Sequence, residues 1–155
     1  MAVLKLKAKQ QTDDYRKRPL DDHGKLRVQY FTLDPTTEAG DANTTIELCE
    51  LPPSAVRIMP YLCRVQTSGF GAGRTLDIGH DAYQARPIDR ADEVADDPDA
   101  FADGLDVSAA GIAAFGTGLK FDVYSLAGIV VKATVLGGTI PVGAALEGVI
   151  VYVYE

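Results

Sequence analysis

The C-terminal third of the chain alternates between apolar and polar residues with the two-residue period of a β-strand. Three segments show this pattern, separated by glycines or a proline: 119–125, 128–136 and 148–154. Successive side chains of a strand point to opposite faces, so each segment presents two distinct faces. Four apolar residues fall on the face where a solvated strand carries polar side chains: Val130, Leu136, Tyr152 and Tyr154. We therefore expect these four residues to pack against a second sheet or a sister subunit.

Five earlier segments have the same strand-like pattern: 26–32, 44–49, 55–59, 61–67 and 74–78. The glycine-rich run 68–73 between the last two predicts a tight turn. Together the segments predict an all-β fold, an antiparallel β-sandwich or jelly-roll-like domain of about eight strands. The pattern does not fix the strand order, so a jelly roll, another sandwich and a partly closed barrel all stay open.

Two segments in the middle of the chain lack this alternation. In the first, Asp97 can cap a helix, Pro98 suits the first helical position, and Gly104 lies just beyond the end. These signals predict one short helix. The second, 107–118, is rich in small residues and predicts a loop packed closely against the sheet.

The length and the charge distribution predict one domain with a basic extension. A chain of 155 residues suits a single core. Residues 1–28 hold eight Lys or Arg against four Asp, a balance of +4, which leaves −11 for residues 29–155 of a chain whose net charge is −7. We expect residues 1–25 to form an extended basic N-terminal arm and residues 26–155 a single β-sandwich domain.

The arm is the part that we expect to bind a partner, either an acidic protein surface or a neighbouring copy of the chain. Its candidate partner-binding residues are basic or aromatic: Lys5, Lys7, Lys9, Tyr15, Arg16, Lys17 and Arg18. Four aspartates interrupt the positive run, and Tyr15 is the arm's only aromatic residue. This composition disfavours binding of nucleic acid.

Motifs for catalysis are weak in this sequence. The two histidines, His23 and His80, lie far apart, and no Gly-x-Ser-x-Gly turn accompanies them. The run Gly69–Arg74 lacks the ending of a phosphate-binding loop. We expect no catalytic residues and no enzymatic activity. One alternative of another class stays open, a β-barrel binding module or small enzyme that holds an anionic ligand with Gly69–Arg74 and His80.

Cofactors, metals and membranes are not indicated either. Free thiols are favoured over a disulfide for Cys49 and Cys63, and neither cysteine has a second zinc ligand nearby. The acidic residues of segment 92–106 do not follow the spacing of a calcium loop. The longest uncharged window, 133–146, is shorter than a bilayer span, so we expect no membrane partner.

Four features occur together in this chain: the basic arm, the block Arg74-Thr-Leu-Asp-Ile-Gly-His80, the acidic segment 97–104, and an ending that includes 138–143 and 152–155. Together they resemble small structural proteins of tailed-bacteriophage virions, and most closely the head decoration, or cement, proteins. The likeness covers nearly the whole chain, but its motifs are structural.

This resemblance implies a compact β-rich module on the capsid exterior, assembled in the host cytoplasm. The implied partner is the major capsid protein, whose neighbouring subunits such a module binds and thereby stabilises. The implied assembly is a homotrimer, and no cofactor is implied. The alternative in the same setting is a tail or head-to-tail connector protein, which would form a ring.

Overall fold

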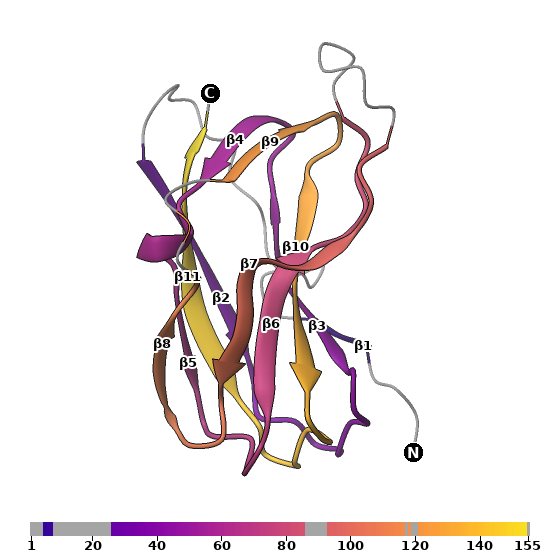
Figure 1. Cartoon of the computed structure of the whole chain (residues 1–155), viewed down its shortest axis with the longest axis vertical. Helices are drawn as coiled ribbons and strands as arrows, with labels where there is room; N and C mark the ends of the chain where they lie inside the picture. The colour runs from indigo at the N-terminus through magenta and orange to yellow at the C-terminus, as the bar shows by residue number, and fades with distance from the viewer. Residues whose placement is uncertain (1–4, 8–25, 86–92, 117, 119–120, 155) are drawn as a thin grey trace.

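The computed structural model describes residues 5–7, 26–85, 93–116, 118 and 121–154. Within these ranges the chain folds into two β-sheets that pack face to face (Figure 1). The predicted all-β sandwich is therefore confirmed. Eleven strands are labelled, more than the eight expected, because several short strands complete the edges of the sheets.

The first sheet, called sheet A, has the strand order β1-β3-β10-β6-β7. Its strands are β1 (Lys5–Lys7), β3 (Thr45–Leu51), β10 (Ile129–Leu136), β6 (Thr75–His80) and β7 (Asp97–Asp106). The pair β1–β3 is parallel and the other pairs are antiparallel. Strand β10 lies at the centre and alternates between buried and half-buried residues, as its sequence predicts.

The second sheet, called sheet B, is built around the long strand β11. Its strands are β2 (Leu26–Leu33), β4 (Ser54–Ile58), β5 (Arg64–Thr67), β8 (Gly111–Ala114), β9 (Phe121–Ser125) and β11 (Leu146–Tyr154). Along one edge β11 pairs with β2 over eight residues. Along its other edge it pairs first with β5 and then with β4, while β8 and β9 extend these two strands outward. A short 3-10 helix, η2 (Pro60–Leu62), joins β4 to β5.

The core lies between the inner faces of the two sheets. Among its largest fully buried side chains are Phe31, Ile46, Leu76, Ile150 and Tyr152. Full burial of an apolar side chain of this size stabilises the fold by roughly 1.5–3 kcal/mol. Because all the large sheet strands contribute to one core, it forms a single cluster.

The predicted helix at residues 97–104 is wrong, because this segment lies in β7. Residues Phe101 and Ala102 are both buried, and Ala102 pairs with Ile78 of β6. Gly79 of β6 leaves room for the backbone of Asp97, which a side chain at residue 79 would overlap. Pairing with β6 and burial of the Phe101 ring thus outweigh the local helix-capping signals.

Two further segments can be compared with their predictions. The predicted loop at 107–118 is wrong in part, because it contains β8, which pairs with β5 through Ala113 and Val65. The tight turn at 68–73 is confirmed, and it carries the chain from β5 of sheet B to β6 of sheet A. Its glycines Gly69, Gly71 and Gly73 all have positive φ, which side chains with a Cβ rarely adopt.

The N-terminal arm predicted at residues 1–25 lies almost wholly outside the described residues. The exception is β1, which runs parallel to β3 with Lys5 opposite Thr45 and Lys7 opposite Glu47. The intervening segment 8–25 therefore connects an edge strand of sheet A to an edge strand of sheet B.

Candidate interaction surface

The outer face of sheet B carries two adjacent columns of apolar residues, one on β2 and one on β11. Three directly opposed pairs form these columns: Leu26 with Val153, Val28 with Val151, and Tyr30 with Val149. Opposed residues of an antiparallel pair point to the same face of the sheet. We call these six residues the β2–β11 patch.

The β2 column of this patch is largely open to solvent. The exposed fractions are 56% for Leu26, 47% for Val28 and 64% for Tyr30. On β11, Val149 and Val153 are half-buried and Val151 is buried. A solvated sheet face usually carries polar residues at such positions, so a contiguous apolar group here indicates a contact surface.

The first half of β2 reverses the usual direction of polar and apolar side chains. Arg27 and Gln29 lie on the inner face, where Arg27 is opposite the buried Tyr152, while Leu26, Val28 and Tyr30 lie on the outer face. A shift of one residue in the pairing would exchange the two sets. In the observed register, the apolar residues Leu26, Val28 and Tyr30 face outward and the polar residues Arg27 and Gln29 face inward.

The second half of β2 holds this register in place. Phe31 is 1% exposed and stands opposite Gly148 of β11, and the buried Leu33 stands opposite the buried Leu146. A Cβ at residue 148 would overlap both the Phe31 ring and the carbonyl oxygen of Arg64. The absence of a side chain at Gly148 thus lets Phe31 pack across β11 and fixes the faces of β2.

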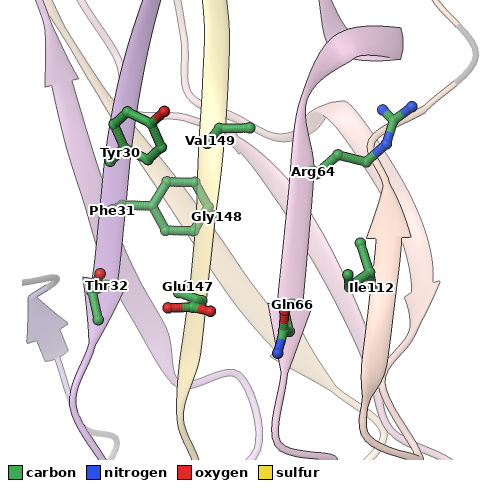
Figure 2. Close-up of a pocket in the computed structure, with 9 residues that line it drawn as sticks. All are labelled: Tyr30, Phe31, Thr32, Arg64, Gln66, Ile112, Glu147, Gly148 and Val149. Carbon is green, nitrogen blue, oxygen red and sulfur yellow. The ribbon is translucent and has the colours of Figure 1, made fainter.

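A shallow groove of about 290 Å³ adjoins the patch. It is lined by residues of β2, β11, β5 and β8, shown in Figure 2: Tyr30, Phe31, Thr32, Arg64, Gln66, Ile112, Glu147, Gly148 and Val149. The register arranges the outward residues in two rows. Tyr30, Val149 and Arg64 form one row, and Thr32, Glu147, Gln66 and Ile112 form the other. Ile112 is 70% exposed at the β8 edge, separated from the patch by the outward Arg64 and Gln66 of β5.

The charges on this face are balanced. Four of the described strand positions on the outer face of sheet B are charged: Arg57, Arg64, Asp122 and Glu147. The Nε of Arg57 donates to Oδ1 of Asp122 over 2.6 Å. Arg64 donates from Nη1 to the carbonyl oxygens of Tyr61 and Cys63, at 2.6 and 2.8 Å. Two cations and two anions leave the described part of the face neutral on a chain of net charge −7.

The four residues predicted to pack against a sheet or a subunit occupy two different places. Tyr152 is 2% exposed on the inner face of sheet B, and Tyr154 is half-buried against the same core. Burial, followed by the nearby Cys49 thiol, raises the pKa of Tyr152 to about 12. Val130 and Leu136 are half-buried on the outer face of sheet A, because their neighbours Ile129, Val131, Ala133 and Val135 point into the core.

Most of the candidate partner-binding residues of the arm cannot be placed. Lys9, Tyr15, Arg16, Lys17 and Arg18 lie outside the described residues, and for Lys5 and Lys7 only the backbone is described, in β1. Their role in partner binding stays a prediction. Sequence reasoning missed the β2–β11 patch, although its signal is present in the alternation of Leu26, Val28 and Tyr30.

The alternative anion site is not brought together by the fold. Arg74 lies just before β6, and its Nε donates to the carbonyl oxygen of Thr139 over 2.5 Å. His80 lies at the other end of β6, is 3% exposed, and contacts the rings of Tyr83, Phe101 and Phe121. A six-residue strand separates the two by roughly 20 Å. They therefore do not form one pocket.

The cysteines and the acidic segment 92–106 form no metal site in the described ranges. Cys49 and Cys63 form no disulfide, as predicted, and both are buried, whereas half-burial was expected. Burial raises the pKa of the Cys63 thiol to about 11. In the ranges that the structure describes, no three His, Cys, Asp or Glu side chains cluster as metal ligands would. The described part of the chain also contains no helix long and apolar enough to span a bilayer.

Comparison with known proteins identifies the fold. No protein-family model and no curated protein sequence matches the chain. A chain in a structure of the capsid of Ralstonia phage GP4 is similar over 98% of this chain and 99% of its own length, with a TM-score of 0.72 and 17% identity. A chain in the capsid asymmetric unit of cyanophage Pam1 is similar over 93% of this chain and 96% of its own length, with a TM-score of 0.47 and 14% identity. At this level of identity, the likeness to the GP4 chain shows a shared fold that extends from end to end.

Proposed function

We propose that this protein is a structural component of a phage virion, a head decoration protein on the capsid exterior. In this role it binds neighbouring subunits of the major capsid protein, stabilises the shell and has no enzymatic activity. Its proposed assembly is a homotrimer, formed in the host cytoplasm. The observation that carries the proposal is the end-to-end likeness to a chain in the Ralstonia phage GP4 capsid.

The physical properties of the surface support this proposal. A protein that binds only the assembled shell stabilises it in proportion to the free energy of binding. Three copies at one threefold position also need a contact surface between them, and the β2–β11 patch with the adjoining groove offers one. The two side chains of the alternative anion site are engaged or buried: Arg74 donates to the Thr139 carbonyl oxygen, and His80 is 3% exposed.

A binding experiment with purified heads tests the proposal. The full-length chain is added to heads assembled from the major capsid protein of the phage that encodes it, and the heads are then sedimented. We expect saturable binding in multiples of three copies per local threefold position, and an increase in the temperature at which the heads open. Absence of binding to heads, or recovery of the protein only with tails or connectors, would contradict a decoration role.

The role of the arm can be tested in the same assay. Deleting residues 1–25 would also remove β1 from sheet A, so substitution is the sharper change. We expect the triple variant Arg16→Gln, Lys17→Gln and Arg18→Gln to keep the fold and to bind heads more weakly, with a reduced dependence on salt. Unchanged occupancy and salt dependence would remove these residues from the contact.

A further inference from the structure

We propose that the β2–β11 patch is the surface through which copies of this chain associate with one another. This inference extends the proposed function, on which it rests for the number of copies, by assigning the contact between them to named residues. It differs from the sequence-based expectation, in which Val130, Leu136, Tyr152 and Tyr154 were the candidates for packing against a second sheet or a sister subunit.

The first argument is the direction of the side chains on β2. Leu26, Val28 and Tyr30 are about half or more exposed, while the polar Arg27 and Gln29 of the same strand point inward. The register that buries Phe31 and Leu33 leaves these three residues outward, where exposed apolar area has an unfavourable free energy of solvation. The arrangement becomes favourable when another surface covers the outer face.

The second argument is the charge of the patch, which selects the kind of partner. Two copies of a chain with net charge −7 repel each other, and they approach most easily through a face whose own charge is balanced. The outer face of sheet B meets this condition, with Arg57 and Arg64 against Asp122 and Glu147 at its described strand positions. A strongly basic partner or a nucleic acid would gain no electrostatic attraction here.

The third argument is the shape of the surface. The exposed part of the patch is the β2 column, an apolar row of Leu26, Val28 and Tyr30 along an edge strand of sheet B, with Val151 buried beside it. Next to this row, the groove over Gly148 and Val149 is bordered by Tyr30 on one side and Ile112 on the other, as Figure 2 shows. A projecting side chain of the second copy, such as its exposed Tyr30, fits a depression of this size.

Sedimentation velocity of the full-length chain over a range of concentrations tests this inference without capsids. We expect the wild-type chain to form an oligomer of its 16.5 kDa subunit. In the double variant Val28→Asp and Tyr30→Asp, self-association should weaken at least ~100-fold, because unpaired carboxylates would be buried in the contact. The matched control is Val142→Asp, at a residue that is 64% exposed outside sheet B and should associate like the wild type.

The salt dependence of self-association distinguishes contact through the patch from contact through the basic arm. Contact through a neutral apolar patch between acidic copies should stay as strong or strengthen from about 0.05 to about 0.5 M salt, because salt screens the repulsion. Contact through the arm should weaken over this range.

Three results would overturn the inference: a wild-type chain that is monomeric at every concentration, charged variants that associate like the wild type, or association that salt weakens. If circular dichroism shows that the double variant does not fold, the single variant Tyr30→Lys replaces it, since Tyr30 is the most exposed residue of the patch. Self-association measured in this way does not depend on whether the protein binds heads. A chain that associates through the patch but does not bind heads would contradict the proposed function alone.

Discussion

The carboxylate of Asp77 accepts a hydrogen bond from the backbone N–H of Gly104, with 2.7 Å between Oδ1 and the nitrogen. The pairing of β6 with β7 is irregular at this point, because Leu105 pairs with Leu76 whereas Ala102 pairs with Ile78. One residue of β6 therefore faces two residues of β7, which is a β-bulge. Gly104 adopts φ +63 in the bulge, and Asp77, 8% exposed, replaces the missing strand partner of its N–H.

Replacing Asp77 with Ala should destabilise the protein by about 1–3 kcal/mol, because the Gly104 N–H loses a charged acceptor. Equilibrium unfolding in urea measures this difference. The matched control is Asp106→Ala, which removes an exposed carboxylate that also accepts a backbone N–H, from Ser108. We expect a clearly smaller loss of stability for the control. Equal losses in the two variants would mean that the bulge does not depend on Asp77.

The position of β2 should depend on the missing side chain at Gly148. A Cβ at this residue would overlap the Phe31 ring and the Arg64 carbonyl oxygen, so Gly148→Ala should destabilise the protein by roughly 1–3 kcal/mol. Gly111→Ala in β8 is the control, because nothing lies within 4 Å of a Cβ there. Chemical denaturation compares the two variants. If Gly148→Ala were no more destabilising than its control, Phe31 would not hold the register of β2.

The strands of the sandwich were predictable where apolar residues alternate within one segment, as in β10 and β11. Sequence patterns failed where a contact distant in the chain decided the outcome. Asp97, Pro98 and Gly104 have the spacing of a capped helix, yet burial of Phe101 and the close approach to Gly79 place them in a strand. Local signals cannot reveal this, because the partner strand ends seventeen residues earlier in the sequence.

The candidate surface was harder to predict than the fold for a related reason. Alternation shows that a strand has two faces, but it does not show which face points to the core. For β11 we assigned the tyrosines to the outer face, whereas Tyr152 lies in the core and Val149 and Val153 face outward. The direction is set by pairing with β2, where Gly148 admits the ring of Phe31, and such a pairing is not a property of β11 alone.

A pair of carboxyl groups on β7 should make stability depend on pH in the acidic range. A side-chain hydrogen bond with Asp99 raises the pKa of Asp97, and burial raises it further. Because the pKa of Asp97 is higher in the folded state, its protonated carboxyl stabilises the fold. This contribution to stability is fully present below the ordinary pKa of 3.8 and is lost as the pH rises through the folded-state pKa. We expect Asp97→Asn to be more stable than the wild type at neutral pH.

The difference in stability between Asp97→Asn and the wild type should shrink as the pH falls below 3.8, the ordinary pKa of the carboxyl, since the wild-type carboxyl then also carries its proton. Thermal unfolding of both proteins as a function of pH measures it. Stability curves that stay parallel from neutral to acidic pH would show that Asp97 and Asp99 do not share a proton.

Alkaline pH should destabilise the protein through two buried groups. Burial raises the pKa of Cys63 from 9.0 to about 11 and that of Tyr152 from 10.0 to about 12. Each group holds its proton more tightly in the folded state. Its contribution to folding stability is therefore fully present below the ordinary pKa and is lost as the pH rises through the folded-state pKa. For Tyr152 the loss falls between pH 10.0 and about 12.

The variant Tyr152→Phe should therefore keep the decline that begins near pH 9.0 with Cys63 and lack the later one. Melting temperatures between neutral and strongly alkaline pH, with the phenolate absorbance of the wild type as a second readout, measure the two steps. A variant whose curve runs parallel to that of the wild type up to pH 12 would contradict the burial of the Tyr152 hydroxyl. In that case the inner face of β11 would have to be reassigned, and with it the outward direction of the valines in the β2–β11 patch.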